Sequence, residues 1–360
     1  MGESTILTRL ERRTFSAETR REIFKSLASL RDQHLDIDAT PMKLVTRENY
    51  KILLHQHRSE FTGKISVGTP EQTEECIMDT GSSTAWIFST KCTDPMCVSK
   101  DNPFDSSKSS TYIPTNHHVK VTFGSGSLTG QLAVDTIKLG GVTMLQQGFG
   151  EILKPDGSVF EQEFGGICGL SFPMSSHNIS LLEGLRRSQD LTKKSITFYY
   201  GKEESAMFLG EPKNYGSINW YPVSEPKYWE TPLKDVTIQG KSILGEKTRN
   251  FSAVFDTGTS ILTTPSKYLS IAKSVLEDIG ITCQMIQAGQ GPKICYHFDK
   301  KADICIDNWF MFDDDICKPA LVSLDLNTDQ GDIFILGQPF LWEHITTYDF
   351  EKNRVGVTKI

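Results

Sequence analysis

The amino-acid sequence predicts a mainly β protein with two domains. From Phe61 onward, short runs rich in Val, Ile, Thr and Phe alternate with Gly, Ser, Asp and Pro, which is typical of many short strands joined by turns. The length of 360 residues suits two domains, because one domain usually takes roughly 100–200 residues. One pattern also occurs twice, about half a chain apart, which indicates two related halves.

The elements expected in the body of the chain are mostly strands. Strand patterns cover Phe61–Val67, His118–Phe123, Ser127–Leu139, Ser195–Tyr200 and Arg354–Lys359. Helices are expected over Ile179–Gln189 and over Ser266–Ile279, where Gly280 stops the second helix. The turn-rich stretch Gly210–Trp220 predicts a domain boundary.

The N-terminal segment differs from the body in charge. Of the 38 Lys and Arg and the 45 Asp and Glu in the chain, residues 1–60 carry 11 and 9, so this segment is mildly basic and the body acidic. A strand is expected over residues 5–10, and apolar side chains at helical spacing predict a helix from Ser16 to Leu30. This helix is either a solvated amphipathic helix or part of a basic arm that docks on the body.

Charge and hydropathy exclude several classes of protein. The net charge of −7 provides no overall basic surface for nucleic acid. No run approaches the roughly 18 apolar residues of a membrane-spanning helix. The first residues, MGESTILTRLERR, lack the apolar core of a secretory signal.

The repeated pattern carries the functional prediction. Cys76–Thr84 and Ala253–Ile261 both place Asp-Thr-Gly, then Ser or Thr, then Ser, after apolar residues. A single Asp-Thr-Gly could be an ordinary turn after a buried strand, but two copies in matching context are rarely accidental. We expect the two strands to deliver Asp79 and Asp256 to buried positions.

The flanking residue types suit a pair of catalytic carboxyls. Gly81 and Gly258 permit the tight turns that point the carboxylates inward. Thr80 and Thr257 can hydrogen-bond across to the opposite loop, whereas Ser82 and Thr259 can donate to the outer carboxylate oxygens. Two carboxylates held close together share one proton, so one can act as base towards a water and the other as acid towards a carbonyl.

With these motifs the chain resembles the pepsin-like aspartic peptidases from about Phe61 to Ile360. Further matching segments are Gly68-Thr69-Pro70, Trp86, Gly124–Gly130, Phe164–Leu170, Tyr215–Trp220 and Ile335-Leu336-Gly337. The resemblance implies a bilobal pepsin-like acid protease fold, with two six-stranded-type β lobes and a cleft between them. It divides the chain into a prosegment and linker (1–58), an N-terminal catalytic lobe (59–213) and a C-terminal catalytic lobe (214–360).

The resemblance also implies a substrate site and its ligands. Ile77, Trp86 and Phe160 are expected to line the apolar pockets nearest the scissile bond, and the hairpin residues Phe123, Gly124 and Ser125 to close over the substrate as a flap. The expected partners are a peptide or protein substrate, the chain's own prosegment and pepstatin-type inhibitors. We expect no cofactor, no metal and no nucleic acid, and a monomer.

Phe123 departs from the family pattern, which has Tyr at this flap position. The ring is kept, but the hydroxyl that bonds the flap-supporting Trp is lost, at a net cost of roughly 0.5–1.5 kcal/mol. We expect a looser flap with reduced but not abolished catalysis. The same substitution occurs in some apicomplexan plasmepsin-like enzymes, so this subgroup is one assignment that the resemblance allows.

The eight cysteines favour an oxidising compartment. The resemblance implies a disulfide between Cys92 and Cys97. Cys76 and Cys168 are expected to lie together behind the active site, as two thiols or as an unusual disulfide. The remaining four, Cys283, Cys295, Cys305 and Cys317, allow three pairings, of which sequential loops are favoured. No paired Cys-x2-Cys motif indicates a metal.

The resemblance gives the basic N-terminal segment a function as a prosegment that packs over the acidic cleft. Acid would protonate the body carboxylates and release the segment, with a maturation cut expected between Asp38 and Arg58. Lys43 and Lys51 are the candidates for the residue that blocks the dyad. The glycosylation sequons at Asn178 and Asn250 favour a secretory route to an acidic vesicle, a vacuole or the outside of the cell, with the signal expected upstream of Met1.

Two other functions compete with peptide hydrolysis. A catalytically silent pepsin-like binding protein would usually lose an Asp or the Gly after it, but both motifs are intact here. A β-rich carbohydrate hydrolase could use two Asp residues, but its chemistry gives the repeated Thr-Gly no role. The sequence therefore favours an aspartic endopeptidase made as an acid-activated zymogen.

Overall fold

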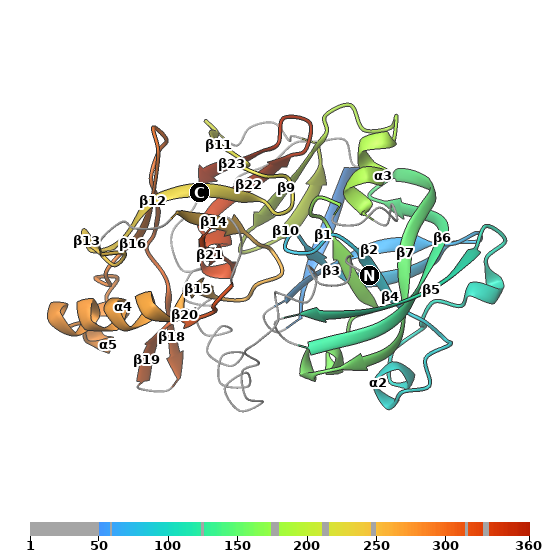
Figure 1. Ribbon diagram of the computed structural model, residues 1–360, viewed down its shortest axis with the longest axis horizontal. Helices are drawn as coiled ribbons and strands as arrows, with labels where there is room; N and C mark the ends of the chain where they lie inside the picture. Colours follow the sequence, from blue (N-terminus) through green and yellow to red (C-terminus); the bar gives the residue numbers. More distant parts are fainter. Residues whose placement is uncertain are drawn as a thin grey trace.

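The computed structural model describes residues 50–57, 60–123, 126–173, 180–210, 216–245, 250–313, 316–326 and 331–360. Most of the predicted prosegment, the flap residues Gly124 and Ser125, and the sequon residue Asn178 lie outside these ranges. The described chain is mainly β, as predicted, and Figure 1 shows two groups of strands with a shared set between them.

The first group belongs to a sheet of thirteen strands. Their order is β11-β23-β22-β9-β10-β1-β2-β3-β8-β4-β7-β6-β5. Their bounds are β1 (Lys51–His57), β2 (Glu60–Val67), β3 (Gln72–Asp79), β4 (Ala85–Phe88), β5 (Ile113–Phe123), β6 (Gly126–Leu139), β7 (Val142–Asp156), β8 (Gly166–Gly169), β9 (Ser195–Tyr200), β10 (Ser205–Leu209), β11 (Asn219–Pro222), β22 (His344–Asp349) and β23 (Arg354–Lys359).

The second group is a sheet of eight strands in the C-terminal half. Seven run in the order β17-β16-β12-β14-β21-β15-β20, and β13 pairs with β12. Their bounds are β12 (Glu230–Ile238), β13 (Lys241–Ser242), β14 (Phe251–Phe255), β15 (Leu262–Thr264), β16 (Ile294–Phe298), β17 (Ile304–Ile306), β20 (Leu321–Ser323) and β21 (Asp332–Leu336). A separate hairpin joins β18 (Phe310–Asp313) to β19 (Ile316–Pro319).

The helices of the described residues are five, and only α4 is longer than two turns. They are α2 (Pro95–Val98), α3 (Leu181–Arg187), α4 (Ser266–Ile279), α5 (Cys283–Gln287) and α6 (Gln338–Leu341), with 3-10 turns η3 (Ser106–Lys108) and η4 (Ser158–Glu161). No helix in the described part of the chain is long and apolar enough to span a membrane.

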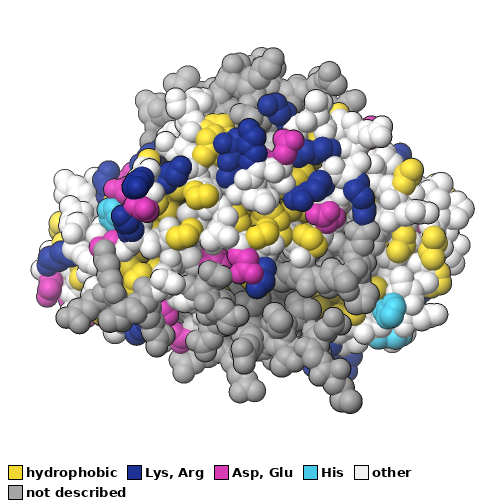
Figure 2. Space-filling model, turned by 45° about the horizontal axis from the view of Figure 1, so that its top comes forward, with side chains coloured by type: hydrophobic (Ala, Val, Ile, Leu, Met, Phe, Trp, Pro, Cys, Tyr) yellow, Lys and Arg dark blue, Asp and Glu magenta, His cyan; other side chains and the backbone are white. Residues whose placement is uncertain are grey.

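On the face shown in Figure 2, Lys and Arg side chains are interspersed with acidic and apolar ones.

Several predicted elements are confirmed with their bounds. The strands β9 and β23 and the helix α4 have the predicted ends. Gly280 stops α4 by adopting the left-handed conformation, with φ of 69°, which glycine reaches without steric cost. The helix α3 is shorter than predicted, because the backbone is already extended at Ser188.

Six neighbouring strands of the large sheet join the two halves of the molecule. The strands β1, β9 and β10 precede the predicted boundary at residue 213, whereas β11, β22 and β23 follow it. In Figure 1 these six strands lie between the other strands of the large sheet and the strands of the eight-stranded sheet. The lobes therefore share hydrogen-bonded backbone, and the boundary itself stays a prediction.

The two Asp-Thr-Gly segments follow equivalent strand pairs. The strand β3, which ends at Asp79, runs parallel to β8, and β14, which ends just before Asp256, runs parallel to β21. The Leu170 N–H donates to the Asp79 carbonyl at 2.7 Å, and the Asp256 N–H donates to the Leu336 carbonyl at 3.2 Å. A second strand thus supports each loop from behind.

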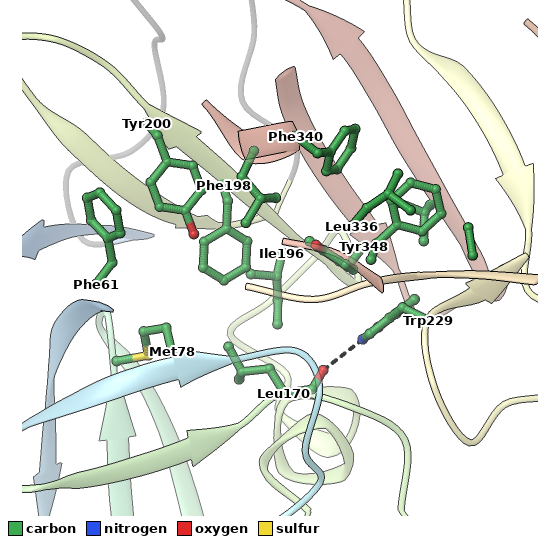
Figure 3. Close-up of a cluster of buried hydrophobic side chains, with 14 of the residues drawn as sticks. Phe61, Met78, Leu170, Ile196, Phe198, Tyr200, Trp229, Leu336, Phe340 and Tyr348 are labelled. Atoms are coloured by element: carbon green, nitrogen blue, oxygen red, sulfur yellow. Dashed lines mark hydrogen bonds between the residues drawn. The ribbon is translucent and has the colours of Figure 1, made fainter. Parts of the chain in front are cut away.

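An apolar core passes continuously behind these loops. Figure 3 shows side chains from both halves in contact, including Met78 and Leu170 on one side and Leu336 and Phe340 on the other. The Trp229 indole N–H donates to the Leu170 carbonyl at 3.0 Å, so this buried donor is satisfied. The core fixes the two loops relative to one another.

Three disulfides are present in the described chain, and they correct one prediction. Cys92–Cys97 closes the small loop implied by the resemblance. The four later cysteines do not form sequential loops. They pair as Cys283–Cys317 and Cys295–Cys305, because the hairpin of β16 and β17 places Cys295 directly opposite Cys305.

Cys76 and Cys168 are two buried thiols and not a disulfide. They come from the paired strands β3 and β8 and interact with one another through a hydrogen bond. Burial raises the pKa of the Cys76 thiol well above its usual range, so it is not a thiolate nucleophile at neutral pH.

Glu74 is a buried carboxyl in the same strand. It is 3% exposed, and its Oε1 has no hydrogen-bond partner among the described residues. Burial raises its pKa to about 8, because a charged carboxylate loses its hydration there. Since the folded state binds this proton more tightly than the unfolded chain, the contribution of Glu74 to stability is present at acidic pH and is lost as pH rises towards 8.

We expect Glu74→Gln to reduce the loss of stability between about pH 5 and 8, by up to about 1.4 kcal/mol per pH unit. The measurement is the free energy of unfolding against pH, with the exposed Glu277→Gln as the matched control. Parallel pH curves for the parent and Glu74→Gln would contradict this assignment.

Candidate active site

The two repeated loops meet at the interface between the lobes. Asp79 is the last residue of β3, and Asp256 directly follows β14. Both carboxyls are largely buried, at 9% and 8% exposure. The apolar strands therefore place both side chains at the edge of the core, where only a small part of each reaches solvent.

A reciprocal pair of threonine hydrogen bonds locks the loops together. The Thr80 N–H donates to the Thr257 hydroxyl at 2.9 Å, and the Thr257 N–H donates to the Thr80 hydroxyl at 3.0 Å. Each hydroxyl also donates onward, Thr80 to the Phe255 carbonyl at 3.0 Å and Thr257 to the Met78 carbonyl at 2.6 Å. The reciprocal pair joins residues that are 177 positions apart and sets the separation of the two aspartates.

The glycines face the opposite carboxylates. A Cβ on Gly81 would lie within 3.0 Å of the Asp256 carboxylate, and a Cβ on Gly258 within 3.0 Å of the Asp79 carboxylate. Relief of either collision would require a movement of the opposite carboxylate, which its hydrogen bonds hold in place. Only glycine permits this approach.

Each carboxylate has the same two donors. The Gly81 N–H and the Ser82 hydroxyl donate to Asp79 at 2.8 and 2.5 Å. The Gly258 N–H and the Thr259 hydroxyl donate to Asp256 at 2.8 and 2.6 Å. The matching geometry gives the site an approximate twofold symmetry and fixes both carboxyl planes.

Burial raises the pKa of both carboxyls, and the charge of Asp256 raises the pKa of Asp79 further. The donors from the loops oppose this effect by stabilising the ionised forms. The two groups titrate as one system, so their pKa values belong to the pair. Such a pair holds one proton over a range of pH.

The predicted pocket residues pack into one apolar cluster beside Asp79. Ile77, Trp86 and Phe160 are all nearly fully buried in it, and their part in substrate binding stays a prediction. Gly130 and Gly150 lie against the Trp86 ring, where a Cβ would collide with it.

The predicted flap is a hairpin of β5 and β6. Phe123 pairs with Gly126 at its closed end, and the backbone of Phe123 is described. The turn residues Gly124 and Ser125 lie outside the described residues. The consequence of Phe123 for flap mobility therefore stays a prediction.

The sequence did not indicate several residues near the dyad. The Ser260 hydroxyl donates to the Glu60 carboxylate at 2.8 Å, across 200 residues of chain. Burial raises the pKa of the Tyr228 phenol, and the charge of Asp256 adds to this effect. Ser260 belongs to the repeat, but Glu60 and Tyr228 lie outside it, so only the folded arrangement shows these positions.

The geometry defines a class of protein. Two buried carboxyls on symmetry-related loops, joined by a hydroxyl clamp and set between two β lobes, form the site of an aspartic peptidase. In the described part of the chain, no group of three or more His, Cys, Asp or Glu side chains could hold a metal ion.

Comparison with known proteins gives the family. The sequence profile of the family "Eukaryotic aspartyl protease" matches residues 60–360. The chain is 33% identical to Pepsin II-2/3 of Oryctolagus cuniculus over 319 residues, which cover 83% of this chain and 80% of the relative. It is 31% identical to Pepsin A of Sus scrofa over 324 residues, covering 84% and 82%. The chain belongs to the eukaryotic aspartyl protease family and is an aspartic-type endopeptidase.

We expect Gly258→Ala to lower kcat by at least about 100-fold, because the added methyl displaces the Asp79 carboxylate. The measurement is peptide hydrolysis under acidic conditions, with folding checked by thermal unfolding. Gly291→Ala is the matched control, since the nearest atoms to its Cβ are 3.7 Å away. Full activity in folded Gly258→Ala would contradict the contact described here.

Proposed function

We propose that Asp79 and Asp256 hydrolyse peptide bonds by activating a water held between them. The observation that carries this proposal is the matched hydrogen bonding of the two buried carboxyls across the threonine clamp. The ionised carboxylate takes a proton from the water as it attacks the peptide carbonyl. The protonated carboxyl donates its proton to the carbonyl oxygen, which gives a neutral tetrahedral diol.

Collapse of this intermediate completes the reaction. The carboxyl that received the proton from water returns it to the leaving nitrogen, the carbon–nitrogen bond breaks, and one hydroxyl of the diol gives its proton to the other carboxylate, which leaves the new carboxylic acid. The dyad ends with one proton, as it began. Thr80, Gly81, Ser82 and their counterparts Thr257, Gly258 and Thr259 support the pair by holding its geometry.

We expect Asp79→Asn and Asp256→Asn each to lower kcat by at least about 1,000-fold, since each removes a proton acceptor or donor from the water-activating pair. Exposed Asp278→Asn is the matched control. The measurement is peptide cleavage read by mass spectrometry, with and without pepstatin. Equal cleavage by the parent and by both variants would assign the activity elsewhere.

The shared proton predicts a bell-shaped pH profile for kcat/KM. At the acid limb both carboxyls are protonated and no base remains, whereas at the alkaline limb both are ionised and no acid remains. Because burial raises the pKa of both groups, the alkaline limb should lie above the ordinary carboxyl range.

The N-terminal segment is assigned as an inhibitory prosegment. Its basic composition is complementary to the acidic body, and the family profile matches the body of the chain, residues 60–360. At neutral pH, Arg and Lys would pair with ionised body carboxylates. Protonation of these carboxylates at lower pH weakens the pairs and releases the segment.

Deletion of residues 1–45 should therefore give activity without prior acid treatment, whereas the full chain should need it. The measurement is cleavage of one peptide at pH 6 before and after incubation at low pH, with the N-terminus of the product determined. The prosegment assignment fails if the deletion leaves activity at pH 6 unchanged. A secretory or vacuolar location, a monomeric state and pepstatin inhibition belong to the same proposal.

A further inference from the structure

A lysine outside the catalytic motifs holds the segment that carries Phe160. Lys100 follows the helix α2, and its N–H donates to the Cys97 carbonyl at 3.0 Å. The Cys92–Cys97 disulfide closes the loop just before it. The backbone of Lys100 is therefore attached to a small, covalently closed unit on the surface of the N-terminal lobe.

The ammonium group of Lys100 points inward from this unit. Its Nζ donates to the Phe160 carbonyl at 2.6 Å and also to the Gln162 carbonyl. It lies 4.6 Å from the centre of the Phe88 ring and 5.0 Å from that of Phe164. One cation thus links two backbone carbonyls of a single turn and two aromatic faces.

The acceptors around Lys100 are unusual for a lysine. Both acceptors that its Nζ contacts are backbone carbonyls, and neither is a carboxylate. Burial lowers the Lys100 pKa to about 8, although the charge of Glu163 opposes this effect. The lysine is still protonated at the acidic pH at which an aspartic dyad acts, so its donors and its charge are both present during turnover.

The segment held by Lys100 joins two functional strands. The turn η4, which contains Phe160, leads from β7 towards β8. The strand β7 pairs with the flap strand β6, and β8 pairs with β3, which ends at Asp79. The Phe160 ring is buried in the cluster of Ile77 and Trp86 and lies against Gly126 at the closed end of the flap hairpin.

We propose that Lys100 is a positioning residue for substrate selectivity, which acts by fixing Phe160 and so the apolar wall beside Asp79. This inference rests on the proposed function, because it concerns the same binding surface. The substrate group that would contact this wall is the apolar side chain next to the scissile bond, which the family resemblance already implies. A large apolar side chain makes close contacts with a rigid wall, whereas a small side chain makes few of them.

The test compares the parent with Lys100→Met, which keeps the apolar stem and removes the charge and the donors. Peptides are varied at the two residues that flank the scissile bond, and kcat and KM are measured for Phe and for Ala at each position. We expect the preference for Phe over Ala to fall about tenfold at one position, mainly through KM, with the Ala peptides changed less than about threefold. Lys100→Arg should retain the preference, because charge and donors remain.

Two controls separate positioning from general damage. Exposed Lys273→Met removes a lysine elsewhere and should leave the preference unchanged. Phe160→Leu should lower the preference, and adding Lys100→Met to it should have little further effect, because both changes act on the same wall. Should Lys100→Met fail to fold, Lys100→Gln replaces it with the same expected direction.

The outcomes distinguish this inference from the proposed function. If the parent cleaves peptides but folded Lys100→Met keeps the full preference for Phe, the inference on Lys100 is wrong and the proposed function stands. Additive effects of Lys100→Met and Phe160→Leu would likewise overturn it. If the parent cleaves no peptide after acid treatment, the proposed function fails first.

Discussion

The reciprocal hydrogen bonds between Thr80 and Thr257 are the constraint on which the rest of the structure depends. They join loops that are far apart in the chain, and they act at the point where two like-charged groups must be held close together. Each bond is buried and satisfied at both ends. Without this clamp the two loops could move apart, and separated carboxyls would no longer share one proton.

The other features of the site follow from that approach. Glycine is required at 81 and 258 because the opposite carboxylate occupies the space of a side chain. The strands β8 and β21 must support the loops from behind, since the loops have no freedom to adjust. Burial of the two carboxyls is unfavourable for their charged forms, but it is what keeps a proton between them. The same burial therefore destabilises the ionised carboxyls and defines the protonation state of the pair.

The sequence predicted the parts of this arrangement that depend on local chemistry. Asp79 and Asp256 were found because each lies in a short pattern whose residues contact one another, and α4 because its end is set by a single glycine. The pairing of Cys295 with Cys305 was missed, because it depends on the register of a hairpin and not on spacing. Contacts such as Ser260 with Glu60 and Lys100 with Phe160 join distant segments, and no local signal marks them.

The six strands shared by the two lobes have a consequence for how the chain reaches its native state. Lys51 pairs with Phe208, and Asn219 pairs with Val357, so these strands must find partners well over a hundred residues away. Contacts of such long range make folding slow, because the entropy of loop closure is lost before the pairing is gained. Neither half can complete this sheet alone, and a partly folded half would expose an unpaired strand edge. Once formed, the sheet also has to open across its middle before the lobes can separate, so the persistence of the native enzyme is governed by the rate of unfolding as much as by its equilibrium stability.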